Sequence, residues 1–204
     1  MIVAEFAVPR EFTFKPGEYV QIILPGELKH YFSVASSPSQ QGIVRIATRS
    51  SQSEFKNKLR SMPLGTAIEI KGPWGDMLLP PDTSRPLVFI AGGIGITPFL
   101  SMLSYVTEEN LPYEITLHYF NSSEALFGPE LEGLVKANSR ISISYISFTP
   151  STSPFIPPQA WGGKFMRALF YLAGPPGFVN AALSALADLQ IPTSQILHES
   201  YTGY

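Results

Sequence analysis

The chain has 204 residues, of which 45% are hydrophobic and 15% charged, so it is too apolar for a disordered protein and long enough to bury a core. The formal net charge of -2 provides no broad basic surface, which argues against nucleic acid or an anionic membrane as a partner. Disulfides, zinc ribbons and cysteine-ligated iron–sulfur clusters are excluded because there is no cysteine, and the three scattered histidines predict no metal site.

The first part of the chain reads as short β-rich segments broken by turn residues such as Pro-Gly and Gly-Pro. The pattern predicts a small antiparallel β-barrel, with strands near residues 1–8, 18–24, 31–36, 42–49 and 66–72. One helix interrupts it, because Ser53 is placed to cap a helix in which Phe55, Leu59 and Met62 are the apolar residues, with basic residues between them. The N-terminus has no signal-peptide pattern, so we expect a cytoplasmic protein.

Residues 86–107 carry no charged side chain and are long enough to cross a bilayer. Their order argues against a membrane helix, because a strand-like run is followed by a glycine-rich turn and then by helical periodicity. Pro98 stands where a helix would begin, at a position that tolerates a missing N–H. We therefore expect no membrane span.

Beyond a stiff, polar linker at residues 80–86 the pattern alternates between strand and helix. Strands are expected at 87–92, 114–120, 141–147, 169–174 and 196–201, and helices at 99–106, 129–136 and 175–189. Such alternation predicts an α/β domain whose parallel sheet binds ligands at the carboxyl ends of its strands. We therefore expect two domains, 1–82 and 86–204, and a lid or surface loop at 148–163.

Two glycine-rich turns end apolar strands of this sheet and open helices. The first holds Gly92, Gly93, Gly95, Thr97 and Pro98, and the second holds Gly174, Pro175 and Pro176. Bare backbone amides at a helix N-terminus suit a pyrophosphate. Glycines also serve tight turns that bind nothing, but two facing turns favour a dinucleotide crevice.

The segments GGIGITP and AGPPGFV, behind a barrel that carries PGEYV, HYFSVASSP and GPWG, resemble the flavin-dependent ferredoxin–NADP reductase superfamily. The resemblance runs from about residue 14 to residue 204, in the family's order. It implies that the barrel binds FAD, or a loosely held flavin, and that the α/β domain binds NADH or NADPH. The implied reaction is hydride transfer from the nicotinamide to the flavin, which passes electrons to a separate iron–sulfur protein, haem protein or free flavin.

The family's arginine-any-tyrosine-serine motif aligns with His30, Tyr31, Phe32 and Ser33. The resemblance implies that Ser33 lies beside the flavin N5 and that Phe32 packs along the ring, and Ser36 is a further expected cofactor contact. His30 replaces an arginine that faces the flavin phosphate. Since neutral imidazole offers one donor in place of a charged fork, we expect weaker flavin retention.

Ser53 matches the serine or threonine that begins the family's phosphate-facing helix, which is compatible with a simple capping role. Either Arg49 or Arg45 could replace the missing charge. We favour Arg49, because Arg45 alternates with inward-facing residues and is also explained as a solvated side chain.

The C-terminal segment HESYTGY supplies a carboxylate and aromatic rings. Glu199 and Tyr201 resemble the family's C-terminal acidic residue and the aromatic that covers the flavin, with Tyr204 as a second candidate for that cover. Ser33, Glu199 and Tyr201 are the expected catalytic residues, as orienting and proton-handling groups. The alternative is a terminal strand whose aromatics only pack.

A 2′-phosphate of NADPH needs a basic side chain, and there is none in residues 120–124 or 147–151, which favours NADH. Lys164 and Arg167 are the two basic residues that could instead favour NADPH. Relatives begin with a further strand, so the barrel is expected to be open on one edge, which favours a homodimer or a missing partner segment. Two other functions remain open: an NAD(P)H:flavin reductase that uses flavin as a substrate, and a non-catalytic electron-transfer or regulatory subunit.

Overall fold

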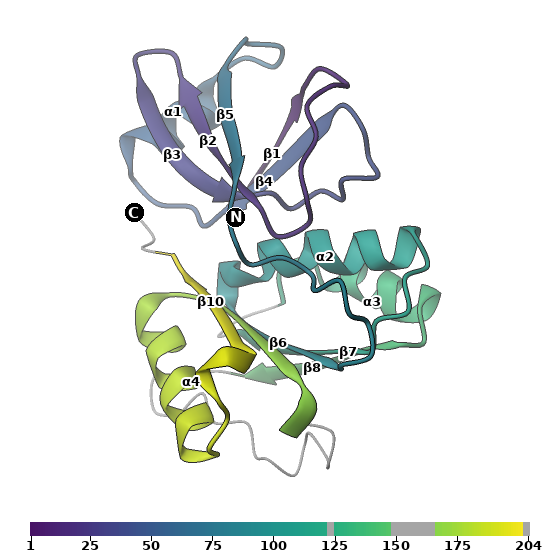
Figure 1. The fold of residues 1–204 in the computed structure, drawn as a ribbon. Helices are drawn as coiled ribbons and strands as arrows, with labels where there is room; N and C mark the ends of the chain where they lie inside the picture. Colours follow the sequence, from purple (N-terminus) through teal and green to yellow (C-terminus); the bar gives the residue numbers. More distant parts are fainter. Residues whose placement is uncertain (122–124, 148–165, 202–204) are drawn as a thin grey trace.

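The computed structural model describes residues 1–121, 125–147 and 166–201. An N-terminal domain of antiparallel strands stands on an α/β domain with a parallel sheet (Figure 1). The predicted fold class is therefore confirmed. The predicted boundaries at 82 and 86 stay a prediction, with the last strand of the first domain ending at Trp74 and the next strand beginning at Leu87.

The N-terminal domain packs two small sheets around one apolar core. Its elements are β1 (Ile2–Ala7), β2 (Tyr19–Leu24), β3 (Leu28–Ser33), β4 (Ile43–Thr48), α1 (Glu54–Ser61) and β5 (Glu69–Trp74). Strands β1 and β4 form one sheet, and β3, β2 and β5 form the other in that order. Alternating side chains such as Val20 and Ile22 meet Phe55 of α1 in the core. Among the described strands, β1 is paired along one edge only, with β4.

Strand β3 begins and ends three residues before the predicted segment. The turn after β2 leads directly into β3, and Leu28 already faces Leu24 in the antiparallel register. After Ser33 the chain crosses between sheets, since the Val34 amide donates to the Glu18 carbonyl and the Ala35 amide donates to the Arg45 carbonyl. Ser33 is therefore the last residue of β3, at the edge that faces the second domain.

The α/β domain follows the predicted alternation. Its elements are β6 (Leu87–Gly92), the short 3₁₀ turn η1 (Gly93–Gly95), α2 (Ile96–Glu108), β7 (Ile115–Asn121), α3 (Gly128–Ala137), β8 (Ile141–Ser147), β9 (Leu169–Gly174), α4 (Pro176–Asp188), η4 (Thr193–Gln195) and β10 (Ile196–Ser200). All five strands are parallel, in the order β10-β9-β6-β7-β8. The chain order reverses at β6, and a crevice outside the carboxyl ends is the expected ligand site in such sheets.

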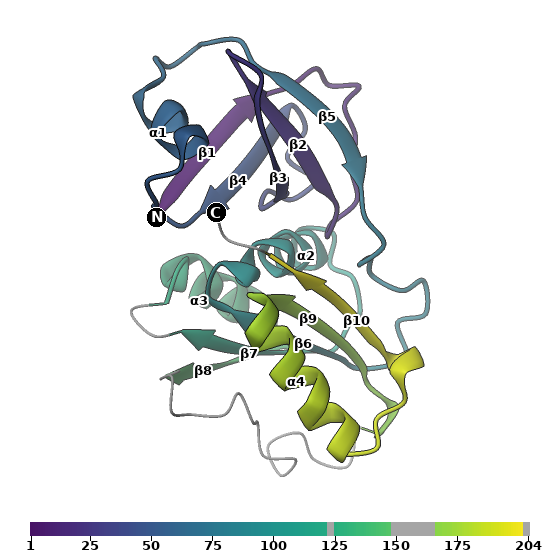
Figure 2. The same cartoon turned by 90° about the vertical axis from the view of Figure 1, so that its left-hand side faces the viewer.

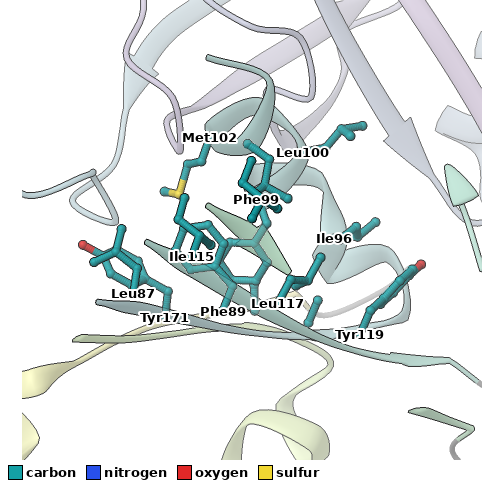
Figure 3. Close-up of a cluster of buried hydrophobic side chains, with 14 of the residues drawn as sticks. Leu87, Phe89, Ile96, Phe99, Leu100, Met102, Ile115, Leu117, Tyr119 and Tyr171 are labelled. Atoms are coloured by element: carbon teal, nitrogen blue, oxygen red, sulfur yellow. The ribbon is translucent and has the colours of Figure 1, made fainter. Parts of the chain in front are cut away.

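Helices cover both faces of the parallel sheet. Helices α2 and α3 lie between the sheet and the N-terminal domain, and α4 lies on the opposite face (Figures 1 and 2). Under α2 the ring of Phe89 stacks on that of Phe99, with ring centroids 4.7 Å apart (Figure 3). Helix α2 begins at Ile96, three residues earlier than predicted, so Pro98 lies in its first turn, where its missing N–H leaves no bond unmade.

The uncharged run thus contains strand β6, the glycine turn and most of α2. No helix in the described part of the chain combines the length and apolar character needed to cross a bilayer.

Side chains from both domains connect them. The Ser101 hydroxyl of α2 donates to the Ser36 carbonyl at 2.7 Å. The Arg45 guanidinium of β4 forms two hydrogen bonds with the Glu130 carboxylate of α3, the shorter at 2.6 Å. The expectation that Arg45 is solvated is therefore wrong: its side chain is 17% exposed, because α3 supplies a carboxylate that the local strand pattern does not show.

Candidate functional site

A cavity of about 250 Å³ lies where the two domains meet. It is bordered by β3, β4 and α1 of the first domain and by the η1–α2 turn and the end of β10 of the second. Its lining consists of His30, Tyr31, Phe32, Ser33, Ala47, Thr48, Lys56, Ile94, Thr97, Ser200 and Tyr201. Four of the residues expected to bind or act on the flavin, from the β3 motif, are thus brought together with Thr97 and Tyr201.

Two of the residues that line the cavity, Ser33 and Tyr201, begin a chain of hydrogen-bonded side chains that ends at the Glu199 carboxylate. The Ser33 hydroxyl donates to the Tyr201 hydroxyl at 2.8 Å, and the Tyr201 hydroxyl donates to Glu199 Oε2 at 2.7 Å. Strand β10 runs along the sheet edge toward the N-terminal domain (Figure 2), and the Tyr201 amide donates to the Gly174 carbonyl beyond its end. The structure therefore joins the three predicted catalytic side chains, although 168 residues separate Ser33 from Tyr201.

Burial sets the protonation of this chain. It raises the pKa of the Glu199 carboxyl above its ordinary value; the hydrogen bond from Tyr201 opposes the rise and the charge of Asp76 adds to it. Burial, and then the neighbouring Glu199, hold the pKa of the Tyr201 phenol well above its ordinary value. Tyr201 therefore remains a neutral hydroxyl at neutral pH, able to accept from Ser33 and donate to Glu199 at once.

The cavity also carries basic groups, His30 and Lys56. Burial and the charge of Lys56 lower the pKa of His30, and burial lowers the pKa of Lys56. Lys56 is only 5% exposed, although in the sequence it is one of the basic residues between the apolar positions of α1. Its spacing could have revealed it, because Lys56 lies three residues before the buried Leu59 and on the same face of the helix.

The predicted substitute cation, Arg49, lies elsewhere. Its guanidinium packs over Gly93 at the end of β6, where a Cβ would collide with it, and it is absent from the described cavity lining. Gly93 has a φ of 55°, a conformation that favours glycine. Arg49 is thus placed at the carboxyl ends of the parallel strands, where a dinucleotide is expected.

The other glycines of the two turns allow close packing of the backbone. A Cβ at Gly95 would collide with the Ala173 carbonyl oxygen, and a Cβ at Gly92 or Gly174 would press on the Phe178 ring. At these three positions the structure shows the tight-turn role that the sequence left open. The hydroxyl of Thr97, which the sequence places in the first of the two turns, donates to the Ile94 carbonyl at 3.0 Å.

The remaining predicted contacts lie in different places. The Ser36 hydroxyl accepts from the Arg45 amide and donates to the Ile43 carbonyl, outside the described cavity lining. The Ser53 hydroxyl accepts from the Lys56 amide and caps α1. Tyr31 lines the cavity and is 61% exposed. Pro98 is buried in α2, whereas Pro175 and Pro176 are exposed at the start of α4. Tyr204 lies outside the described residues.

The chemistry of the lining suits a flavin. The ring of Phe32 and the side chains of Ala47 and Ile94 provide apolar walls, and the hydroxyls of Ser33 and Tyr201 provide polar groups. Within residues 1–121, 125–147 and 166–201 there is no cluster of three or more histidine, aspartate or glutamate side chains that could hold a metal ion.

Comparison with known proteins agrees with this division. Residues 1–78 match the family model of the oxidoreductase FAD-binding domain, and residues 89–183 match that of the oxidoreductase NAD-binding domain. The chain thus consists of an FAD-binding and an NAD-binding oxidoreductase domain, and it has the fold of a ferredoxin–NADP reductase. Its cofactors are accordingly FAD and a nicotinamide dinucleotide.

Similar proteins include reductases of several kinds. The chain is 29% identical to oxidoreductase NAD-binding domain-containing protein 1 of Xenopus tropicalis, over 94% of this chain and 71% of that protein. It is 26% identical to the reductase component of propane 2-monooxygenase from Rhodococcus jostii, over 96% of this chain and 57% of that protein. The chain thus spans little more than half the length of that curated relative.

Solved structures show the same fold. An Amycolatopsis cytochrome P450 reductase superposes with a TM-score of 0.80 at 20% identity, over 97% of this chain and 64% of that one. The FAD/NAD-binding domain of the nitric oxide dioxygenase from Vibrio cholerae gives a TM-score of 0.81 at 20% identity, over 98% of this chain and 92% of that one.

Proposed function

We propose that this protein oxidises NADH by way of bound FAD and delivers the electrons to a separate acceptor. The observation that carries the proposal is the hydrogen-bonded set of Ser33, Tyr201 and Glu199, which is assembled from both domains and of which Ser33 and Tyr201 line the cavity. If Tyr201 were only a packing aromatic at the end of the chain, its hydroxyl would not need to accept a hydrogen bond from Ser33 and donate one to Glu199.

Each side chain has a distinct part in the proposal. A bound flavin supplies the hydride-accepting chemistry that protein side chains lack. Ser33 orients the ring through its hydroxyl, Tyr201 covers the cavity until the nicotinamide arrives, and Glu199 holds or releases a proton at its carboxyl. Arg49, which packs over Gly93, and the exposed start of α4 are proposed to bind the dinucleotide phosphates, in place of the flavin phosphate that the sequence suggested for Arg49.

The acceptor is proposed to be a separate protein or free flavin. Similar chains include the reductase component of a propane 2-monooxygenase and the flavohemoprotein of Halalkalibacterium halodurans, of which this chain covers 57% and 52%. This chain has no cysteine to ligate an iron–sulfur cluster.

NADH is the proposed donor, from the lack of basic side chains at residues 120–124 and 147–151. Residues 122–124 and 148–151, like Lys164, lie outside the described residues, and Arg167 is exposed just before β9. The test is an anaerobic titration of the FAD-loaded protein with NADH and with NADPH, followed by the flavin absorbance. NADH is expected to bleach the flavin; no flavin spectrum after FAD is supplied, or no bleaching with either nucleotide, would defeat the proposal.

A flavin reductase is the second candidate, and His30 in place of arginine favours it. Gel filtration distinguishes the two, because flavin that separates from the protein supports a substrate role and flavin that co-elutes supports a cofactor role.

A non-catalytic subunit is the third candidate, and NADH-dependent reduction of ferricyanide excludes it.

The open edge of β1 supports a homodimer as a further proposal. Met1 and Val3 are 51% and 43% exposed, and β1 is hydrogen-bonded on one side among the described strands. Light scattering of the purified chain tests it, with Val3→Lys expected to yield monomers.

The cytoplasmic location stays a prediction from the sequence, which cell fractionation tests.

A further inference from the structure

We propose that the aromatic surface formed by Tyr19, Tyr31 and Trp74 is the docking site of an electron-accepting protein with a basic surface. The inference rests on the proposed function, because it names the kind of acceptor that receives the electrons. It restricts that acceptor to proteins whose docking face carries an excess of lysine and arginine.

The three rings of the aromatic surface touch one another on the face of the β3-β2-β5 sheet that is opposite to its core. The ring centroids lie 5.8 Å apart for Tyr19 and Tyr31, 6.1 Å for Tyr19 and Trp74, and 6.2 Å for Tyr31 and Trp74. Tyr31 and Trp74 are 61% and 43% exposed. Single exposed apolar side chains are normal, but rings in mutual contact and open to water are typical of interaction sites, where tyrosine and tryptophan contribute most of the binding energy.

The aromatic surface extends from the flavin cavity to a second, open hollow. Tyr31 lines the cavity, next to Ser33. Tyr19 and Trp74 line a hollow of about 730 Å³ between the end of β5 and strand β10, and Glu199 lines it too. A protein bound to the aromatic surface would therefore lie beside the proposed flavin, which an acceptor must approach because electron transfer slows steeply with distance.

The charge of the hollow selects the partner. Its titratable lining includes the carboxyl groups of Glu18, Asp76 and Glu199, and the described lining contains no lysine or arginine. Glu18 accepts a hydrogen bond from the Lys15 backbone amide at 2.7 Å, which holds the carboxylate without neutralising it. Such a surface attracts a basic protein and repels an acidic one.

The lysines on the neighbouring strands leave this charge in place. Lys71 of β5 is 3.3 Å from the Glu69 carboxylate, with which it forms an ion pair. Lys29 lies two residues before Tyr31 on β3, on the side away from the second domain.

The test compares two probe proteins of opposite charge. Cytochrome c is a basic haem protein, and a plant-type ferredoxin is an acidic iron–sulfur protein. Calorimetry with the FAD-loaded full chain measures the binding of each. Cytochrome c is expected to bind roughly 10-fold more tightly than ferredoxin, and this preference is expected to disappear as salt rises from about 0.05 M to about 0.5 M.

Turnover provides a second readout. Each NADH oxidised supplies two electrons, which reduce two ferric haems, and one proton is released. Trp74→Ala is expected to weaken cytochrome c binding and to lower kcat/KM for its reduction roughly 10-fold, with ferricyanide reduction unchanged. Tyr145→Ala is the matched control, because Tyr145 is 46% exposed on β8, at the sheet edge opposite to β10.

Charge variants test the sign of the surface. Glu18→Lys is expected to lower the preference for cytochrome c over ferredoxin roughly 10-fold. Glu5→Lys, at an exposed position of β1, is the control and should change the preference by less than about 2-fold. Should Trp74→Ala fail to fold by circular dichroism, Glu18→Lys and the salt dependence of the wild type decide.

Several outcomes would overturn the inference. They are equal or tighter binding of ferredoxin, equal effects of Trp74→Ala and Tyr145→Ala, and conversion of a dimer to a monomer by Trp74→Ala, which would make the surface an interface between copies of this chain. An equal loss of hexaammineruthenium(III) reduction in Trp74→Ala would mean a site for small cations instead.

The proposed function fails separately from this inference. Selective binding of cytochrome c without any NADH oxidation would defeat only the proposed function. Oxidation of NADH with ferricyanide but no selective binding of cytochrome c would defeat only this inference.

Discussion

At the scale of single residues, the hydroxyl of Ser33 links the cavity to the C-terminal strand. It has one proton, and that proton is donated to Tyr201. Ser33 must therefore turn away from Tyr201 before it can donate to a ligand, so the two side chains have related but separable effects on the reaction.

Ser33→Ala is expected to slow flavin reduction by NADH roughly 5-fold to 150-fold, because it removes one hydrogen bond worth about 1 to 3 kcal/mol near the reacting atoms. Flavin binding should be nearly unchanged, since the apolar walls of the cavity remain. Stopped-flow absorbance measures the rate, and Ser61→Ala, in the exposed last turn of α1, is the matched control. A rate equal to wild type would show that Ser33 does not contact the reacting ring.

Glu199 gives a pH dependence whose sign follows from its raised pKa. The folded protein keeps the carboxyl protonated at pH values where the unfolded chain has lost the proton, so the free energy of unfolding falls as pH rises from the ordinary glutamate pKa to the raised one. Glu199→Gln removes that loss. As pH rises above the ordinary glutamate pKa, the variant should gain stability relative to wild type, as measured by urea unfolding; a pH-independent difference would contradict this.

Sequence reasoning at this scale identified side chains that a short motif carries, and it missed those defined by distant partners. Ser33 and Tyr201 stand in recognisable segments. Lys56 and Arg45 stand in ordinary amphipathic patterns that do not reveal their surroundings. Only the packing of α1 against β3 shows that Lys56 is buried at the cavity, and only the packing of α3 against β4 shows that Arg45 is paired with Glu130.

At the scale of elements, the strand–turn–helix units were predicted well because apolar periodicity and glycine or proline punctuation are local properties of the chain. Their edges were less predictable. Strand β3 is shifted because its limits are set by hydrogen bonds to β2, and β5 begins at Glu69 because the Thr66 amide is held by the Pro63 carbonyl in a turn.

The turn between β6 and α2 tests the packing role of its glycines. Gly95→Ala places a methyl group against the Ala173 carbonyl and is expected to lower the free energy of unfolding by about 1 to 3 kcal/mol. Gly133→Ala, in α3 with open space around it, is the control and should raise stability by about 0.5 to 1 kcal/mol. Urea unfolding measures both, and equal effects would refute the close-packing explanation.

At the scale of the whole molecule, contacts between side chains of the N-terminal domain and side chains of the α/β domain fix how the two domains are placed. The pair of Arg45 and Glu130 is the clearest case, because it is bidentate and its side chains are 17% and 35% exposed. The sequence predicted two domains and their order, but the relative placement depends on residues 85 apart, for which the chain offers no local pattern.

A double-mutant cycle of Arg45→Met and Glu130→Gln is expected to give a coupling of about 1 kcal/mol in urea unfolding. The same cycle at Lys71 and Glu69, whose side chains are 53% and 60% exposed, is the control and should give a coupling near zero. Similar values for the two cycles would mean that the interdomain pair contributes no more than a surface pair.

The hydrogen-bonded set of Ser33, Tyr201 and Glu199 has one consequence for any attempt to divide the molecule. Its serine comes from the first domain, its acid from β10 and its phenol from the residue after β10, so neither domain holds a complete set. A fragment that stops before β10 keeps Ser33 but loses Tyr201 and Glu199, so it is expected to turn yellow with flavin and yet to be bleached by the pyridine nucleotide more slowly than the full chain.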